Sequence, residues 1–302
     1  MYETSGYHQI AAFGKYENNT FSVCFEKQLL SAGDDDRRGP THNGESMDEA
    51  IQFYDDLASY YHLIFENWDA SMARQGDAIA PLIRAELDWS QPQTARVLDV
   101  ACGIGTQTLP LAARGFQMVA RDLSPAAVIR LQREAEARHL VVDAGVADMR
   151  QVRSSVLGAF DVVIAFDNSV AHLLNDDDFR TAFQEFLAVL RPGGVFLCSV
   201  RDYDKVQRGE PATVDHGTRE EGGQIYQLAQ QWSWDDPMHY QSTFTVNRET
   251  PNGPARVVST VSRFNAISTG RLLELMREAG FRECRRIDET ISQPILLGRK
   301  GA

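Results

Sequence analysis

Short apolar runs alternate with amphipathic stretches through the middle of this chain. The apolar runs have the length of buried strands, and the stretches between them repeat their apolar residues at helical spacing. Because strands that alternate with helices are joined by right-handed crossovers, the pattern predicts an α/β fold with a doubly wound, mostly parallel sheet. The predicted strands cover 95–100, 116–121, 141–147, 160–166 and 194–200.

Two of the intervening helices carry clear end signals. One begins at SPAAV, where Ser124 can cap the helix and Pro125 takes its first position. The other is predicted from about residue 177 to 190, with three phenylalanines on one face. The RPGG sequence at 191–194 is expected to end it, because proline cannot continue a helix.

The chain before the alternating region has a polar part and a helical part. Residues 1–46 are polar and mixed in character, so we expect an N-terminal extension outside the core. The globular domain is predicted to span 47–302 and to begin near Ser46, which can cap a helix. Helices are predicted around 48–58 and 70–88.

The pattern of apolar and polar residues changes again after residue 204. Amphipathic runs separated by short turn sequences favour antiparallel strands, and we interpret 205–267 as a β insertion in the same domain. The insertion is predicted to hold strands at 224–234, 238–248 and 255–267; a helix at 270–279 and strands near 282–288 and 293–298 follow it.

Length, charge and cysteine use narrow the class of protein. The 302 residues, with a net charge of −12, suffice for one large core domain. No apolar run reaches the roughly 18 residues of a membrane span and no secretory signal is evident, so we expect a soluble cytoplasmic protein without a membrane partner. The acidic balance argues against nucleic acid as a partner. The four cysteines are scattered, without the paired spacing of a metal site, and suit a reducing compartment.

The turn after the first predicted strand has the composition of a ligand-binding loop. The strand ends in Asp99, and the turn contains Gly103 and Gly105 before a helix begins. Glycines let the backbone approach a ligand closely, and the helix directs free N–H groups to the same place. A lone GxG is also common in tight turns, so this feature has little specificity by itself.

Acidic residues follow the next two strands. Asp122 ends the second strand, where a carboxylate can accept both hydroxyl hydrogens of a ribose, and Asp148 follows the third, where it can hold an adenine amino group. Because the carboxyl ends of parallel strands meet at one edge of the sheet, the three acids indicate a nucleoside site there.

The turn distinguishes a dinucleotide from S-adenosylmethionine. A dinucleotide site continues as GxGxxG, but Thr108 occupies the third glycine position here. Asp99 would repel a pyrophosphate, whereas it suits the cationic amino group of a methionine moiety. The residues therefore favour S-adenosylmethionine, and hydride transfer ranks last among the enzyme hypotheses.

Four segments in order resemble the motifs of class I S-adenosylmethionine-dependent methyltransferases. They are VLDVACGIGTQTLPLAARG, ARDLS, VADMR and LRPGG, and they cover roughly residues 95–200. The resemblance implies a seven-stranded, Rossmann-like sheet whose last two strands form an antiparallel hairpin. It also implies cofactor contacts at Gly103, Asp122, Asp148 and Met149. The complete set of predicted cofactor-binding residues is Tyr61, Trp68, Arg74, Asp99, Ala101, Gly103, Gly105, Asp122, Leu123, Asp148, Met149 and Asp167.

Two further segments resemble the glycine and sarcosine N-methyltransferases, namely FDVVIAFDNSVAHL at 160–173 and SVRDYD at 199–204. The resemblance implies that Arg201 holds the substrate carboxylate and that Asn168 lies beside the amine, and we predict both as catalytic residues. Tyr203 joins them as a predicted substrate-binding residue. A guanidinium fork suits a carboxylate. The alternative for Arg201 is an ion pair with Asp202 or Asp204 that only shapes the loop.

The chain departs from that family at two positions of these segments. Asp167 replaces a glycine beside Asn168, and Asp202 replaces an asparagine. These departures leave open whether the acceptor is glycine, another amino acid or a different small amine.

The region upstream of the first strand supplies aromatic residues. By the same resemblance, Tyr61 and Trp68 lie where aromatics close over the cofactor, and Arg74 is the candidate for binding its carboxylate. Helix packing is the alternative for both aromatic residues. His172 could be a base, although a histidine in such a turn more often bonds the backbone.

The sequence thus predicts N-methylation of a small-molecule acceptor, with S-adenosylhomocysteine as the second product. Two alternatives stay open: O- or C-methylation of a larger phenolic or quinone-type metabolite, and a regulatory protein that binds S-adenosylmethionine without catalysis. The N-terminal extension and the β insertion are both candidates for self-association into a homo-oligomer.

Overall fold

The computed structural model describes residues 7–10, 24–27, 42–87 and 94–301. The chain divides into two compact units, Met1–Thr41 and His42–Ala302. The described part of the first unit is an antiparallel pair of strands, β1 (Tyr7–Ile10) and β2 (Cys24–Lys27). The second unit contains everything described below.

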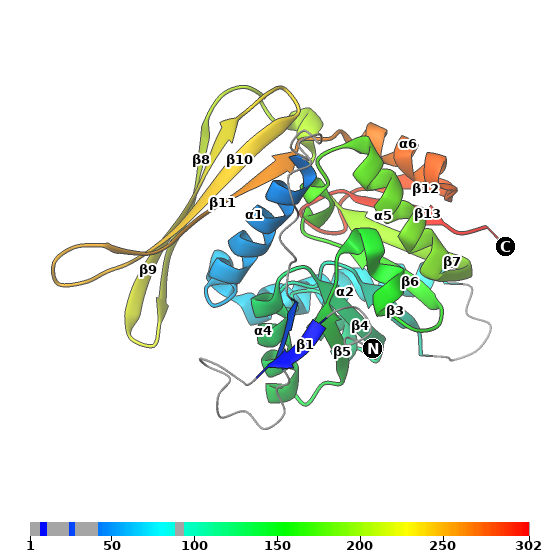
Figure 1. Ribbon diagram of the computed structural model, residues 1–302, viewed down its shortest axis with the longest axis horizontal. Coiled ribbons are helices and arrows are strands. Elements are labelled where there is room, and N and C mark those ends of the chain that lie inside the picture. Colours follow the sequence, from blue (N-terminus) through cyan, green and yellow to red (C-terminus); the bar gives the residue numbers. More distant parts are fainter. Residues whose placement is uncertain (1–6, 11–23, 28–41, 88–93, 302) are drawn as a thin grey trace. The chain divides into compact units, whose positions relative to one another are not determined.

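A seven-stranded sheet forms the centre of the second unit (Figure 1). Its order is β12-β13-β7-β6-β3-β4-β5; β5, β4, β3, β6 and β7 are parallel, whereas β13 and β12 form an antiparallel hairpin at one edge. This confirms the predicted mostly parallel sheet and its terminal hairpin. The strands are β3 (Arg96–Asp99), β4 (Gln117–Asp122), β5 (Val142–Val146), β6 (Phe160–Ala165), β7 (Leu190–Ser199), β12 (Arg282–Ile287) and β13 (Ile295–Arg299).

Helices cover both faces of this sheet. On one face the phenylalanines of α5 pack against Phe196 of β7, with Phe186 at 5.0 Å between ring centroids. On the other face Ile79 and Ile83 of α2 are fully buried in a cluster with residues of β3 and β6. The helices are α1 (His42–Leu57), α2 (Trp68–Glu86), α3 (Thr108–Ala113), α4 (Pro125–Ala137), α5 (Asp176–Val189) and α6 (Thr269–Ala279).

Two helix ends follow the sequence signals, namely the start of α4 and the end of α5 at Val189, shortly before RPGG. The starts of α1 and of the strand β7 differ from the predictions. The Ser124 side chain accepts a hydrogen bond from Ala127 N and caps α4, as predicted. α1 begins at His42, so Ser46 lies inside the helix and does not cap it. The RPGG segment is not a separate turn, because β7 already begins at Leu190. The register of β7 against β6 shifts at this point, which accommodates the proline and glycines as an irregularity of the strand.

The β insertion is an antiparallel sheet of four strands, in the order β11-β10-β9-β8. Three of them correspond to the predicted strands, and β8 was missed. β8 is an edge strand with the sequence ATVDHGTREE, no residue of which is fully buried, so it lacks the apolar alternation that identifies a strand. The strands are β8 (Ala212–Glu221), β9 (Gln224–Trp234), β10 (His239–Arg248) and β11 (Ala255–Asn265).

The helix α1 joins the insertion to the central sheet (Figure 1). Phe53 and Leu57 of α1 are buried in one cluster with Phe244, Val246 and Val258 of the insertion. The same helix is hydrogen-bonded to the start of α4 through Asp55, described below. The insertion therefore faces the carboxyl edge of the parallel strands, where the sequence places the candidate ligand residues.

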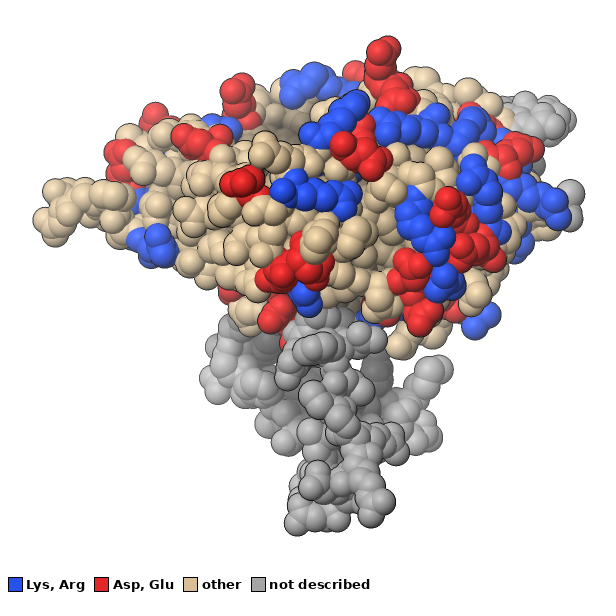
Figure 2. Space-filling model, turned by 90° about the horizontal axis from the view of Figure 1, so that it is seen from above, with Lys and Arg blue, Asp and Glu red and all other residues tan. Residues whose placement is uncertain are grey.

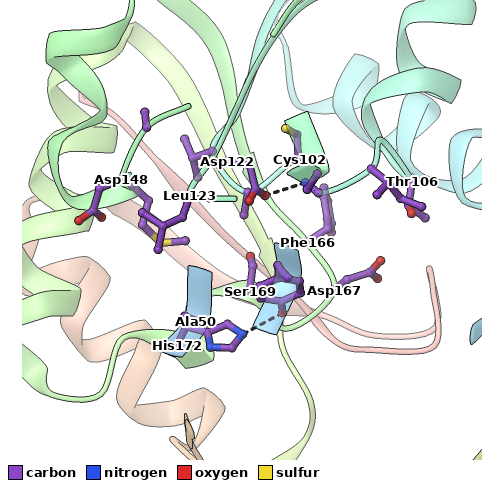
Figure 3. Close-up of a pocket in the computed structure, with 18 of the residues that line it drawn as sticks. Ala50, Cys102, Thr106, Asp122, Leu123, Asp148, Phe166, Asp167, Ser169 and His172 are labelled. Carbon is purple, nitrogen blue, oxygen red and sulfur yellow. Dashed lines mark hydrogen bonds between the residues drawn. The ribbon is translucent and has the colours of Figure 1, made fainter. Parts of the chain in front are cut away.

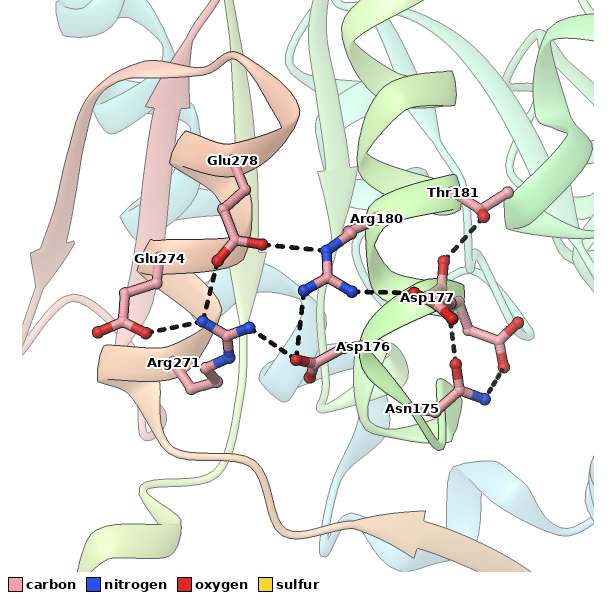
Figure 4. A network of polar contacts seen from close by, with 9 residues as sticks. Asn175, Asp176, Asp177, Arg180, Thr181, Arg271, Glu274 and Glu278 are labelled. Atoms are coloured by element: carbon pink, nitrogen blue, oxygen red, sulfur yellow. Dashed lines mark hydrogen bonds and ion pairs between the residues drawn. The ribbon is translucent and has the colours of Figure 1, made fainter.

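Charged side chains of both signs are interspersed on the face shown in Figure 2. One group joins α5 and α6 (Figure 4): Arg271 pairs with Asp176 at 2.6 Å and Glu278 at 3.0 Å, and Arg180 also pairs with Glu278 at 3.0 Å. These groups are partly exposed, so each pair contributes little stability. No helix of the described residues is long and apolar enough to cross a membrane.

Candidate active site

A cavity lies at the carboxyl edge of the parallel strands (Figure 3). It holds about 1060 Å³ of empty space, its open mouth included. The walls come from α1, the 3-10 turn η3 (Tyr61–Ile64) and the loops that follow β3, β4, β5 and β6. Its lining includes these predicted residues: Tyr61, Ala101, Gly103, Asp122, Leu123, Asp148, Met149 and Asp167.

The two glycines of the turn after β3 have different functions. Gly103 lines the cavity with a φ of +50°, and an added Cβ would meet no atom within 4 Å, so glycine is needed for its backbone conformation. Gly105 has a φ of +102°, and its Cβ would lie 2.5 Å from Leu131 Cδ1 of α4. Gly105 therefore permits packing of the turn against α4 and does not line the cavity, and its predicted cofactor contact stays a prediction.

Asp99 also lies outside the cavity lining. It is only 1 % exposed, accepts a hydrogen bond from Thr108 Oγ1 at 2.7 Å, and accepts a second one from Ala101 N at 3.2 Å. Burial raises the pKa of Asp99 to about 7. The Asp99 carboxylate thus holds the two ends of the turn together, and its predicted contact with a methionine amino group stays a prediction.

Asp122 is held at the cavity wall by backbone groups. Its two carboxylate oxygens accept hydrogen bonds from Gly103 N at 2.7 Å and from Ser124 N at 2.9 Å. Burial raises the pKa of Asp122, and these N–H groups oppose the shift. Because each carboxylate oxygen has a second lone pair, Asp122 can still accept from two ligand hydroxyls.

The loop after β5 places Asp148 and Met149 in the cavity. Asp148 caps the 3-10 segment η4 (Met149–Ser155) by accepting from Arg150 N at 2.9 Å. The Arg150 guanidinium pairs with Asp148 at 2.8 Å and with Asp178 of α5 at 2.9 Å. The carboxylate of Asp148 is therefore fixed and its charge is balanced within the protein.

The segment after β6 has an unusual backbone. Asp167 and Asn168 both have positive φ, +55° and +66°, a conformation that residues other than glycine rarely adopt. Asp167 N donates to Ser199 Oγ at 2.8 Å, and Asp167 Oδ2 accepts from Gln107 Nε2 at 2.9 Å. Asp167 and Ser169 line the cavity, whereas Asn168 between them does not. Strain of this kind often marks functional sites.

Asn168, Arg201 and Tyr203 form one hydrogen-bonded group beside the cavity. Asn168 Oδ1 accepts from Arg201 N at 2.9 Å, and Asn168 Nδ2 donates to Tyr203 Oη at 2.8 Å. Tyr203 Oη lies 2.9 Å from Tyr240 Oη of β10. The structure thus brings the three predicted acceptor residues together, next to the cavity but outside its lining.

The guanidinium of Arg201 has no acidic partner among the described residues. Asp202 pairs with Arg286 at 2.7 Å and with Lys205 at 3.0 Å, so the predicted alternative of an Arg201–Asp202 ion pair is not realised. The guanidinium lies 4.4 Å from the ring centroid of Trp232 in β9, and its buried Nε makes no hydrogen bond. Stacking on an aromatic ring orients the fork while leaving its donors available.

The residues predicted upstream of β3 separate in the structure. Tyr61 lines the cavity, and Trp68 lies behind it, donating from Nε1 to Thr106 Oγ1 at 3.1 Å. Arg74 is exposed on α2 and outside the lining. The reason is helical geometry: α2 turns its Met72 side towards the core, and Arg74 is two positions, or about 200°, further round the helix.

The lining also contains His172, considered above as a possible base, and Tyr54, which was not predicted from the sequence. Tyr54 of α1 hydrogen-bonds His172 Nε2 at 2.8 Å, and Ser262 Oγ lies 3.3 Å from His172 Nδ1. Burial lowers the pKa of His172 to about 4, so the ring is neutral at pH 7, while a contact with the backbone at Arg263 opposes this. The expected backbone bond of His172 is thus accompanied by side-chain contacts. No motif places α1 over the sheet, so Tyr54 was missed.

Similarity to known proteins agrees with this geometry. Residues 97–194 match the methyltransferase-domain family model. The chain is 29% identical over 200 residues to the glycine/sarcosine N-methyltransferase of Parasynechococcus marenigrum, covering 65% of this chain and 67% of that protein. It is 27% identical over 173 residues to the corresponding enzyme of Halorhodospira halochloris, covering 57% of each.

Solved structures show the same fold. An amino pentose methyltransferase from Micromonospora echinaspora superposes with a TM-score of 0.65 at 19% identity, covering 80% of this chain and 95% of that chain. An S-adenosylmethionine-dependent methyltransferase from Clostridium acetobutylicum superposes with a TM-score of 0.63 at 16% identity, covering 76% and 92%.

The segment that matches the family model contains the glycine turn and Asp122, Asp148 and Asp167 of the cavity lining. Residues 97–194 are therefore a methyltransferase domain, and the chain resembles the S-adenosylmethionine-dependent glycine/sarcosine N-methyltransferases.

Proposed function

We propose that this enzyme methylates the nitrogen of a small amine that carries a carboxylate, with glycine, sarcosine or a similar amine as the acceptor. The observation that carries the proposal is the Arg201 guanidinium, stacked on Trp232 without an acidic partner among the described residues. Curated relatives named glycine/sarcosine N-methyltransferase support the same reading.

In this proposal the cavity holds the cofactor by its nucleoside end. Asp122 accepts hydrogen bonds from the ribose hydroxyls, and Asp148 with Met149 holds the adenine. The positions of these groups in the cavity lining support this assignment. Tyr54 and Tyr61 line the same cavity, and their rings would exclude water from the reacting groups.

The main catalytic contribution of the protein in this proposal is to align the acceptor with the methyl donor. When bound, S-adenosylmethionine supplies a methyl group activated by a sulfonium. Arg201 would hold the acceptor carboxylate in its fork, and Asn168 would fix the Arg201 backbone while its second amide N–H faces the amine. Positioning of this kind can contribute roughly 7–11 kcal/mol. The amine must lose a proton before it attacks, because only its neutral form has a free lone pair.

A methyl-transfer screen tests the acceptor. The wild-type protein would be incubated with S-adenosylmethionine and with glycine, sarcosine, larger amino acids, an amino sugar or phenolic metabolites, and methylated products identified by mass spectrometry. We expect transfer to a carboxylate-bearing amine. Reaction with phenols alone would establish the O- or C-methylation alternative, and tight cofactor binding without any transfer would establish the regulatory one.

Substitution of Arg201 tests its role on the acceptor. Because a hydrogen bond to a charged group is worth about 1.5–3 kcal/mol, Arg201→Gln should raise KM for a carboxylate acceptor by about 10- to 100-fold. The affinity for S-adenosylhomocysteine, measured by calorimetry, should stay the same. Arg153→Gln, on an exposed arginine of η4, is the control. An unchanged KM in Arg201→Gln would contradict the proposal that Arg201 binds a carboxylate of the acceptor.

A further inference from the structure

The cavity lining contains two carboxylates that the nucleoside assignment does not use, Asp178 and Asp167, and Asp178 is paired with Arg150 at 2.9 Å. Asp122 and Asp148 account for the ribose and adenine of the proposed cofactor, and Asp99 lies outside the lining. Asp167 remains. No Lys, Arg or His of the described part of the chain pairs with it, and its hydrogen-bond partner is the neutral amide of Gln107.

Asp148, Asp122 and Asp167 follow an order along the cavity. In Figure 3, Asp148 and Asp167 lie on opposite sides of the lining, with Asp122 between them, and Asp167 lies on the side of Thr106. Burial raises the pKa of Tyr61, and the charges of Asp167 and Asp122 add to this rise, so both carboxylates lie near the Tyr61 ring. If Asp148 and Asp122 mark adenine and ribose, Asp167 marks the third part of the cofactor, the methionine moiety.

The local structure holds this carboxylate in place. Its backbone is fixed by the bond from Asp167 N to Ser199 Oγ, and one side-chain oxygen is held by Gln107. Gln107 itself is only 4 % exposed, and its Nε2 also donates to Gln75 Oε1 at 2.7 Å. The second oxygen, Oδ1, makes no hydrogen bond within the described protein and is left for a ligand donor.

A half-buried carboxylate without a cationic partner is stabilised when a ligand supplies the positive charge. The methionine moiety carries an ammonium group, which has three donors and a positive charge. We propose that Asp167, rather than Asp99, recognises the α-ammonium of the cofactor, with Gln107 orienting the carboxylate. This inference rests on the cavity being the cofactor site.

Two ligands separate the ammonium from the rest of the cofactor. S-adenosylhomocysteine carries the amino-acid part but no sulfonium, and 5′-methylthioadenosine has the same nucleoside without the amino acid. Calorimetry would measure both affinities for the wild type and for Asp167→Asn, which keeps the shape and tolerates the positive φ. We expect about 10- to 100-fold weaker binding of S-adenosylhomocysteine and less than about 2-fold change for 5′-methylthioadenosine.

The direction of the affinity change distinguishes the ammonium of the ligand from its carboxylate. S-adenosylhomocysteine also carries a carboxylate, but removing a negative charge near that group would strengthen binding, not weaken it. Asp122→Asn is the matched control and should weaken both ligands, since both contain the ribose. Asp167→Gly, in which any φ is permitted, provides a second variant, and the thermal midpoint without ligand checks that each variant is folded.

Each other outcome contradicts the inference. Equal loss for both ligands would show that Asp167 acts on the nucleoside or on the shape of the cavity. If Asp167→Asn bound S-adenosylhomocysteine normally but S-adenosylmethionine more weakly, Asp167 would interact with the sulfonium. If its affinity for both of these ligands were unchanged, the acceptor amine would be the partner of Asp167. Failure of the wild type to bind either ligand would instead contradict the cofactor site itself.

Discussion

Asp99 and Asp122 end neighbouring strands, yet their carboxylates meet different surroundings. Asp99 is enclosed by the turn that it stabilises, whereas Asp122 reaches the cavity wall. The one-dimensional pattern is the same for both, an acid at the end of an apolar run. What separates them is the set of partners in the folded protein. Asp99 accepts hydrogen bonds from Thr108 and Ala101. Asp122 instead accepts from Gly103 and Ser124 at the cavity wall.

His172 provides a prediction at the scale of one residue. Its pKa is about 4 in the folded protein against 6.5 in the unfolded chain, so the unfolded chain binds the proton first as pH falls. The stability that neutral His172 contributes is present above pH 6.5 and is lost as pH falls from 6.5 towards 4. We expect the titration of His172 to lower the unfolding free energy of the wild type by about 2 kcal/mol between pH 7 and pH 5. Chemical denaturation at the two pH values measures this change.

The comparison with His172→Gln isolates this effect. Asp99 acts in the opposite direction, because its raised pKa makes the folded state relatively more stable as pH falls below 7. Asp99 is common to both proteins, so it cancels in the difference between them. Equal pH dependence in wild type and His172→Gln would mean that His172 titrates normally in the folded protein.

At the scale of elements, α1 connects the cavity to the insertion and to α4. Ala50 and Tyr54 of this helix line the cavity, as does Ala58 in the turn that follows it. On another side of the helix, Asp55 accepts hydrogen bonds from Ser124 Oγ and from Ala126 N, the latter at 3.0 Å, so it caps the start of α4 from a different helix. The carboxylate also lies favourably at the positive end of the α4 dipole.

Removal of this cap should weaken the attachment of α1. Asp55→Ala is expected to lower the free energy of unfolding by about 1 kcal/mol, the usual cost of losing a cap, as measured by urea denaturation. Asp56→Ala is the matched control, because Asp56 accepts only from Gln52 of the same helix in the described contacts. A loss in Asp56→Ala as large as in Asp55→Ala would indicate a general helix effect.

Several elements were predictable and others were not. The parallel strands, the cap of α4 and the three apolar strands of the insertion follow from periodicity and end signals, because each is decided by local sequence. The strand β8 was not predictable, because an exposed edge strand needs no apolar alternation. The early start of β7 was not predictable either, since RPGG is tolerated in a strand only where an irregularity of register accommodates it.

At the scale of the whole molecule, the second compact unit, His42–Ala302, contains every described residue of the cavity. The acceptor group around Arg201 belongs to the same unit. We therefore expect a protein lacking residues 1–40 to remain folded and to bind S-adenosylhomocysteine within about 2-fold of the full chain, which is less than about 0.4 kcal/mol.

Calorimetry and thermal unfolding of this shortened protein test the expectation. The full-length chain, measured at the same concentration, is the control. A fall in affinity of more than 10-fold with an unchanged thermal midpoint would mean that the N-terminal residues contribute to the site.

The sequence by itself determined the fold class and the cofactor class, and it predicted the acids proposed to hold the nucleoside, because these depend on periodic patterns and on motifs at strand ends. Only the tertiary structure decided which of those side chains share the cavity. It placed Asp99, Gly105 and Arg74 outside the lining and brought in Tyr54 and His172, and it left Arg201 without an acidic partner among the described residues. The physical reason is that the direction of a side chain depends on turns and packing between elements far apart in the chain.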